Sequence, residues 1–544
     1  MSGPVRVWAR VAAVVALGVL VAVWSPNYAV MLAAAVALPI VAGRHAPAVV
    51  VFLAVTAREA PDGRGFAAVT RLGAQIYYEG KVPAIDLLAL SAIAVALVRL
   101  RRRGDRPVVR RVAWVLLGIL AALAVLAFAL GIVYGQSAFS AANQNSRNFV
   151  AVALGVAIGL LIVAFPEEIR AVQVAAVTGL GVLVLAAAYA VATGQAADDR
   201  VSRYFTYYDS ALPAVAIAVF GALLVARSRL TRLAGLAMGL SVTLVLIGFR
   251  VTIWLAAAVV LVLVVVLSRE WTAVARRAAI SALALGLGIL ILPGMRSDIT
   301  ERLVGASSVA PSVAPTPSTK NRPATTAPAS PARPSAGPPR TASAPPALKS
   351  PVSSALPAPK SPISSASPAR KSPVPVASPS RKPPPKAGGQ DVAAESSQGH
   401  LEDIRVAWSA VRKNFWTGIG PQHPQLPGLA SDRTTVLYVH NEWLQDWLRF
   451  GPGAVLLVTA FLLVVAWLSV RTLAGRSAPA LHRAAAVFGL ITPITLLAFP
   501  YFSDSAQWPL LLGIAAGILA AAQTPAAQTP ASGDSRAGEP SGAP

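Results

Sequence analysis

The sequence contains no cysteine and few charged side chains. Only 13% of its 544 residues are charged, and 23 residues are acidic. The lack of cysteine excludes disulfides, cysteine-ligated zinc and thiol nucleophiles. The five histidines are scattered along the chain, and no group of acidic residues accompanies them. We therefore predict that the protein uses no metal and no other cofactor.

Long hydrophobic runs take the place of the alternating pattern that is typical of a soluble protein. Apolar residues make up 55% of the chain. A helix that crosses the hydrocarbon layer needs roughly 20 mostly apolar residues, because its backbone must be hydrogen-bonded internally. The runs predict an all-α polytopic integral membrane protein with about 12–14 transmembrane helices. The candidate spans are 11–24, 29–41, 48–57, 84–98, 112–133, 149–165, 171–192, 211–226, 233–249, 251–267, 278–292, 453–470, 484–499 and 510–522.

The net charge of +24 is explained by membrane topology and by one low-complexity segment, so nucleic-acid binding is not inferred. Short loops rich in Lys and Arg favour the cytoplasmic side. The arginine-rich loops are 101–111, 227–232, 269–277 and 471–483. Their alternation with apolar spans predicts that both termini are cytoplasmic. The abundance of Ala, Val, Arg and Pro is typical of a GC-rich bacterial genome, so we expect the membrane to be a bacterial plasma membrane.

The spans and loops divide the chain into four parts. We expect an N-terminal helix bundle at 1–293, a large extracytoplasmic loop at 294–450, C-terminal transmembrane helices at 451–523 and a disordered cytoplasmic tail at 524–544. Within the loop, residues 306–390 are rich in Pro, Ala, Ser and Lys and include no acidic residue. Such a segment cannot bury a core and is predicted to be disordered, whereas 400–450 is expected to be helical. The insertion is either a basic arm for anionic wall polymers or lipid headgroups, or a segment without a selected partner, which we favour.

The apolar stretch 233–267 is too long for one helix. We expect two helices joined by a turn at Gly248 and Arg250, which places Arg250 at the outer membrane surface. A charge there costs far less than at the centre of a span. One long tilted helix is the alternative, and it would invert the charge pattern of the neighbouring loops.

Polar motifs return in the last part of the large loop. Apolar residues at helical spacing predict an amphipathic helix over 401–415. These residues are Leu401, Ile404, Ala407, Trp408 and Val411. A turn follows at Gly418 and Gly420, and the segment 439–451, which contains His440, is expected to be a helix leading into the next span.

This arrangement resembles the O-antigen ligase and O-antigen polymerase superfamily of membrane glycosyltransferases. In that family a large outer loop ends in a His-Asn pair, a Leu and a Gly-rich entry into the next helix. The matching residues here are His440, Asn441, Leu444, Leu448, Gly451 and Gly453. Upstream, the family's Arg-Trp pair and Gly-x-Gly turn look like Arg405, Trp408, Gly418 and Gly420. The similarity runs from about Arg200 to Gly453, and its specific part is only the last stretch of the loop.

The resemblance implies a metal-independent, inverting transfer of a glycan from a polyprenyl pyrophosphate carrier to an acceptor hydroxyl at the outer face. The acceptor would be a glycan, a lipid or a protein, with membrane lipids around the enzyme. His440 would be the base, and Arg250 would bind the pyrophosphate together with Arg203 or Arg200. We prefer Arg203 because it is nearer the membrane, whereas Arg200 follows Asp198 and Asp199, two carboxylates able to neutralise it. Asn441 and Arg405 would support the site.

Other interpretations stay open at this point. The family's Asn-Pro-containing patch is replaced by 207–210, and the Gly that usually follows the second Arg is Val251, so donor selection is not assigned. If His440 has no catalytic role, it is a solvated or helix-capping residue at the membrane interface. If Arg250 does not bind the donor, it only fixes the orientation of its span in the membrane. A multi-pass transporter or permease would place charged residues at the midplane of several spans and show an inverted repeat. A non-catalytic envelope scaffold would use the helices only as an anchor.

Overall fold

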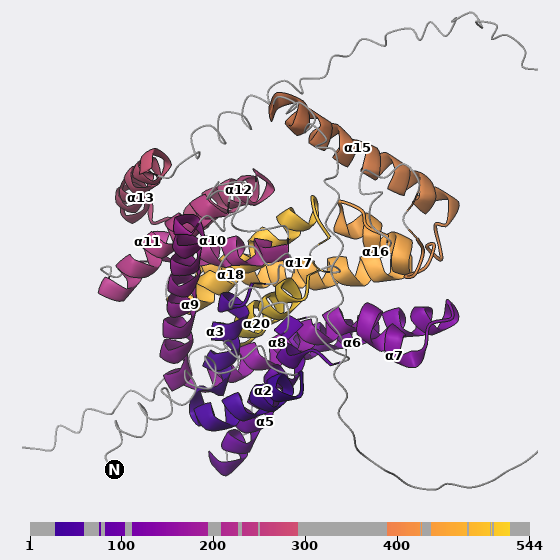
Figure 1. Cartoon of the computed structure of the whole chain (residues 1–544). Helices are drawn as coiled ribbons and strands as arrows, with labels where there is room; N and C mark the ends of the chain where they lie inside the picture. The colour runs from indigo at the N-terminus through magenta and orange to yellow at the C-terminus, as the bar shows by residue number, and fades with distance from the viewer. Residues whose placement is uncertain are drawn as a thin grey trace, which may run out of the picture. The chain divides into compact units, whose positions relative to one another are not determined.

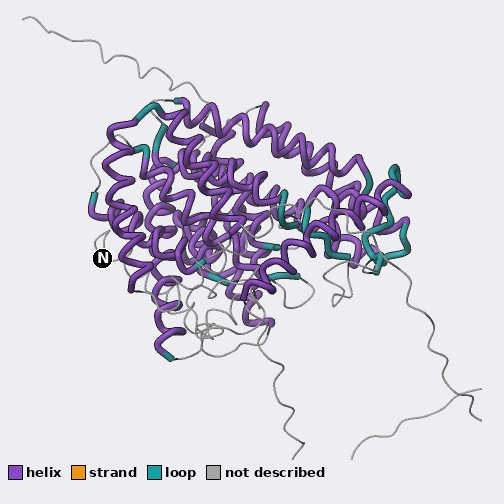
Figure 2. The backbone as a smooth tube through the Cα atoms, turned by 90° about the horizontal axis from the view of Figure 1, so that it is seen from above, coloured by secondary structure: helices purple, strands orange, loops and turns teal. Residues whose placement is uncertain are grey.

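Helices make up most of the described part of the chain. The computed structural model describes residues 28–58, 76–77, 82–103, 111–193, 208–226, 231–248, 251–291, 389–424, 426, 437–475, 478–500, 502 and 505–522. Every regular element within these ranges is a helix (Figure 1; Figure 2). The all-α prediction is therefore confirmed for this part of the chain.

Helices occupy the predicted apolar runs from residue 29 onward. The first bundle contains α2 (Tyr28–Ala42), η1 (Gly43–His45), α3 (Ala46–Thr56), α5 (Ala84–Arg103), α6 (Arg111–Val133), α7 (Ala138–Ser140), the π-helix η2 (Ala141–Ser146), α8 (Arg147–Ala164), α9 (Pro166–Ala192), η5 (Tyr208–Ser210), α10 (Ala211–Leu224), α11 (Arg232–Ile247), α12 (Val251–Ser268) and α13 (Trp271–Ile291). The later helices are α15 (Gly389–Lys413), α16 (Glu442–Phe450), α17 (Pro452–Ala474), α18 (Ala480–Leu496) and α20 (Gln507–Ala522). The predicted span 11–24 lies outside the described residues.

The helices are those of a protein embedded in a membrane. Five of them, by length and apolar composition, are able to cross a bilayer: Ala29–Thr56, Arg111–Val133, Ala138–Ala164, Pro166–Ala190 and Pro452–Ala474. The five shorter apolar helices α10, α11, α12, α18 and α20 accompany them. Large apolar side chains point outward from several helices, such as Leu185 at 71% exposure and Leu456 at 69%. Hydrocarbon accepts such side chains, whereas water does not.

Small residues let α8 and α20 pack at very short range (Figure 1). A Cβ added to Gly155 would lie 2.4 Å from the carbonyl oxygen of Leu510, and one added to Gly513 would lie 2.1 Å from that of Val152. Between membrane helices the hydrophobic effect gives no driving force, so close backbone contact supplies much of the association. Glycine is therefore required at these two positions.

Two arginines bind the carboxyl end of α10. Arg277 on α13 donates to the carbonyl of Leu223 at 2.8 Å, and Arg483 on α18 donates to that of Val225 at 2.5 Å. The last carbonyls of a helix have no partner within the helix and carry partial negative charge. The two guanidinium groups satisfy these carbonyls and join three helices at one end of the bundle.

The stretch 233–267 forms two helices, as expected. Helix α11 ends at Ile247, Gly248 is its C-cap and α12 begins at Val251. A Cβ on Gly248 would lie 2.4 Å from Cγ of Pro213, so the tight turn against α10 requires glycine. The alternative of one long helix is wrong.

The backbone divides into two units, Met1–Val309 with Gly388–Pro544, and Ala310–Ala387. The second unit lies outside the described residues, and so do the tail at 524–544 and most of the predicted insertion 306–390. The exception is the end of that insertion, because α15 already begins at Gly389.

Candidate functional site

Helix α15 is amphipathic, but its buried face differs from the predicted one. Ala407 and Val411 are fully buried, and they pack with Leu448 of α16 in a small separate cluster. Leu401 and Trp408, which were expected on the inner face, are 53% and 43% exposed. The inner face instead begins with Asp403, four residues before Ala407, and the Asp403 side chain is fully buried.

Asp403 pairs with His440. The Nδ1 atom of His440 lies 2.5 Å from Oδ2 of Asp403, and the histidine side chain is 19% exposed. The ring also makes edge contacts with Tyr438 and Phe499, whose centroids lie at 4.9 and 5.9 Å. Burial of a carboxylate is costly unless it is paired, so the contact gives Asp403 its partner and orients the imidazole.

His440 precedes a helix and does not lie within one. Helix α16 begins at Glu442, and Asn441 is its N-cap, with its side chain accepting a hydrogen bond of 3.0 Å from the Leu444 N–H. The prediction of one helix from 439 was wrong, because Asn in the capping position ends the extended backbone and starts the helix. The Asn441 side chain also donates to the Leu497 carbonyl at 2.9 Å, which ties this segment to the end of α18.

The predicted glycine turn is present and supports the end of α16. Gly418 and Gly420 have φ values of +67° and +97°. The N–H of Ile419 donates to the Leu448 carbonyl at 2.7 Å. A Cβ on Gly418 would lie 2.5 Å from the same carbonyl oxygen. Both the left-handed conformation and the close contact therefore require glycine here.

The buried polar residues of α16 fix the segment that carries His440. The Gln445 side chain accepts from the Val439 N–H at 2.8 Å, immediately before His440. Glu442 accepts from the Phe502 N–H at 2.7 Å, which holds the chain between α18 and α20 against α16. The position of His440 is thus fixed by a contact of the preceding residue with α16 and by contacts of α16 with the segment before α20.

The structure does not bring all predicted site residues together. Arg405 lies on α15, but its side chain is 77% exposed and its partner is Glu402 at 3.5 Å, not His440. Arg250, Arg203 and Arg200 lie outside the described residues. Asn441 is next to His440, but its side chain caps α16. Of the predicted residues, His440 and Asn441 therefore share one location, and Arg405 faces away.

Sequence reasoning missed Asp403 as a member of the site. No role was predicted for this residue from the sequence. A signal was present, since Asp403, Ala407 and Val411 recur every fourth residue, as a single helix face does. The partner, however, is 37 residues away, and only the folded chain brings the two together.

The described residues of the sequence patch 207–210, which are 208–210, connect three helices through buried polar contacts. Asp209 is fully buried and accepts from Nη2 of Arg58 at 2.7 Å and from Nε at 3.0 Å. Ser210 accepts from the Trp508 indole N–H at 3.3 Å. Its described residues thus join the end of α3 to the beginnings of α10 and α20.

In the described part of the chain no three His, Asp or Glu side chains gather in a way that suits a metal ion. No protein-family model matches the sequence, and no curated protein resembles it closely enough to count as a match. The case for function therefore rests on the residues themselves and on their geometry.

Proposed function

We propose that this protein is a membrane glycosyltransferase that transfers or polymerises a glycan from a polyprenyl-pyrophosphate carrier. The acceptor is a hydroxyl of a glycan, lipid or protein at the outer face. The observation that carries the proposal is the pairing of His440 with the buried carboxylate of Asp403 at 2.5 Å. A histidine held in this way has a defined tautomer and orientation, which a general base requires.

In the proposed step the acceptor hydroxyl replaces the pyrophosphate at the anomeric carbon of the donor sugar. With Nδ1 facing Asp403, Nε2 of His440 takes the proton of the acceptor hydroxyl, and the hydroxyl oxygen forms a bond to the anomeric carbon of the donor sugar. The bond from that carbon to the pyrophosphate oxygen breaks, and the polyprenyl pyrophosphate leaves with the electron pair. Attack from the opposite face inverts the configuration. Asp403 is a positioning residue that stabilises the imidazolium formed in this step.

The arginines expected to bind the pyrophosphate are Arg250 and Arg203, with Arg200 as the alternative to Arg203. Guanidinium groups bind phosphate oxygens through paired hydrogen bonds and stabilise charge that develops on the leaving group. The resemblance to the O-antigen ligase and polymerase superfamily supports this assignment. Asn441 supports His440 by starting α16 beside it.

The topology that belongs to this proposal places His440 outside the cytoplasm and both termini within it. About 12–14 spans cross a bacterial plasma membrane, as the arginine-rich loops predict. The arrangement of the described helices is consistent with this, because Arg99 meets Glu167 and Arg277 meets α10 at loops expected in the cytoplasm.

A genetic experiment tests the proposal. The gene is deleted and restored as wild type, as His440→Ala or as His423→Ala, and surface glycans and carrier-linked intermediates are profiled by mass spectrometry. His423 is the matched control, since its Nδ1 pairs only locally, with the carbonyl of Pro424 at 2.7 Å. We expect carrier-linked glycan to accumulate in the deletion and in His440→Ala, and to return to normal in His423→Ala. Unchanged glycans in the deletion, or full rescue by His440→Ala, contradict the proposal.

A further inference from the structure

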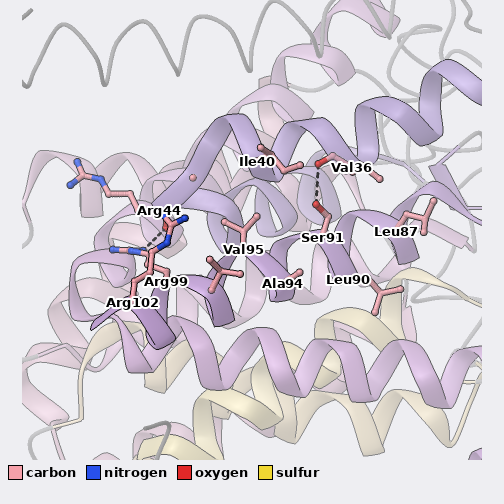
Figure 3. Close-up of a pocket in the computed structure, with 12 residues that line it drawn as sticks. Val36, Ile40, Arg44, Leu87, Leu90, Ser91, Ala94, Val95, Arg99 and Arg102 are labelled. Atoms are coloured by element: carbon pink, nitrogen blue, oxygen red, sulfur yellow. Dashed lines mark hydrogen bonds between the residues drawn. The ribbon is translucent and has the colours of Figure 1, made fainter. Parts of the chain in front are cut away.

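A groove between α2 and α5 combines apolar walls with an arginine-rich end (Figure 3). Its volume is about 720 Å³, within the range of small-molecule sites. The walls include Ile40 and Leu90, which are 61% and 50% exposed on the outer surface of the bundle. Arg44, Arg99 and Arg102 lie together at one end, and Val36 and Leu87 lie toward the other (Figure 3).

Hydrogen bonds between the two helices shape this groove. The Ser91 hydroxyl donates to the Val36 carbonyl at 2.9 Å, and Arg99 donates to the Arg44 carbonyl at 3.0 Å. Eight residues separate Val36 from Arg44 and also Ser91 from Arg99, so α2 with the following η1 runs parallel to α5. The arginine end is therefore held in place by the backbone of η1 (Gly43–His45).

The arginine end carries more positive than negative charge. Its two carboxylates belong to α9: Glu167 binds Arg99 at 2.7 Å and Arg103 at 2.5 Å, and Glu168 binds Arg99 at 3.0 Å. His45 lies between these groups, with Nδ1 3.1 Å from a Glu168 carboxylate oxygen and Nε2 accepting from Arg44 Nε at 3.0 Å.

Arg44 and Arg102 remain without an acidic partner among the described residues, and both are exposed. Four guanidinium groups lie near this end, but the two carboxylates contact only those of Arg99 and Arg103. An anion at this end would bind to the uncompensated pair Arg44 and Arg102.

We infer that this groove binds an anionic glycerophospholipid of the surrounding membrane, with its phosphate at Arg44 and Arg102 and an acyl chain along α2 and α5. The exposed apolar walls fit a chain that already lies in hydrocarbon, and the charge selects an anionic headgroup. A water-soluble anion would leave the apolar walls without a partner. The N-terminal segment 1–27 suits the groove less well, because its charged side chains, Arg6 and Arg10, would add positive charge to this end. The inference is independent of the proposed transferase reaction.

Lipid binding to the purified full-length protein tests the inference without any activity measurement. Native mass spectrometry compares phosphatidylglycerol with phosphatidylcholine at equal concentrations. We expect preferential binding of phosphatidylglycerol by the wild type, and a loss of about fivefold in this preference for each of Arg44→Gln and Arg102→Gln. The charge-preserving variant Arg44→Lys/Arg102→Lys should retain most of it.

Arg101→Gln is the matched control, because Arg101 is exposed at the same end of α5 but does not line the groove. It removes the same charge and should keep the preference. Size-exclusion profiles identify variants that have lost their fold. If a Gln variant is lost in this way, the Arg44→Lys/Arg102→Lys variant still tests whether the positive charge is sufficient for the lipid preference. Equal binding of the two lipids by the wild type overturns the inference. So does a loss in Arg101→Gln as large as in the groove variants, since the effect would then be one of general surface charge.

Discussion

The carboxylate of Asp403, on a long helix outside the apolar bundle, lies 2.5 Å from the ring of His440 at the entry to α16. The carboxylate is fully buried and the histidine is partly accessible. A buried acid that orients a more accessible histidine is the arrangement expected when the histidine accepts a proton from a substrate. It leads to the first prediction.

Replacement of Asp403 by Asn should abolish most of the proposed transfer activity while the protein stays folded. The Asn amide donates to Nδ1 of His440 and forces the tautomer whose Nε2 already carries hydrogen, so that nitrogen cannot accept a proton. We expect a loss in kcat of about 10²-fold or more, with little change in KM for the donor. The assay is glycan transfer by purified protein from a polyprenyl-pyrophosphate donor.

The control for this measurement is Glu402→Gln. Glu402 is the preceding residue of α15, is 56% exposed and pairs with the exposed Arg405. It should retain wild-type kcat. If Asp403→Asn keeps full activity, the pairing is only a structural contact between α15 and α16.

Asn441 should contribute to stability through two separable contacts. Asn441→Ala removes the cap of α16 and the bond to the Leu497 carbonyl, and each loss costs about 1 kcal/mol. Asn441→Asp keeps the cap acceptor and loses only the donor to Leu497. In detergent, the unfolding temperature should therefore be highest for the wild type, lower for Asn441→Asp and lowest for Asn441→Ala. An equal loss in both variants would show that the cap contributes nothing.

The α8–α20 interface should not tolerate any side chain at Gly513. A Cβ there would lie 2.1 Å from the Val152 carbonyl oxygen, so Gly513→Ala must push the helices apart. We expect a cost of about 1–3 kcal/mol or more, seen as a lower unfolding temperature in detergent. Gly118→Ala is the control, since nothing lies within 4 Å of its added Cβ. That variant should be neutral or slightly stabilising, because alanine favours a helix.

The buried ion pair of Arg58 and Asp209 should show strong coupling. Removal of either partner leaves a charge buried between α3 and α10, which costs about 3–5 kcal/mol. The double variant Arg58→Met/Asp209→Leu should be much less destabilised than the sum of Arg58→Met and Asp209→Leu. The measurement is a double-mutant cycle on thermal unfolding. Additive losses would mean that other contacts of these residues dominate.

The location of the helices follows from local sequence. Each apolar run must satisfy its own backbone hydrogen bonds in lipid, so a run such as 112–133 becomes a helix, here α6 (Arg111–Val133), whatever its neighbours do. The turn at Gly248 was predictable for the same reason, because two spans need a break. The glycine turn at Gly418 was predictable as well, since few other residues adopt its backbone conformation.

Tertiary structure decided what these helices bring together. Periodicity marks a face of α15, but it does not say whether Leu401 or Asp403 turns inward; the partner His440 decides that, because only a paired carboxylate is stable when buried. In the same way, the run of arginines at the end of α5 was readable as a topology signal. The folded chain determined that Glu167 and Glu168 compensate Arg99 and leave Arg44 and Arg102 for an anion. The sequence by itself thus determined a helical membrane protein with a histidine near its last spans, since those properties depend on local hydropathy and backbone chemistry. The partners of its charged groups were decided by packing, since they come from residues far apart in the chain.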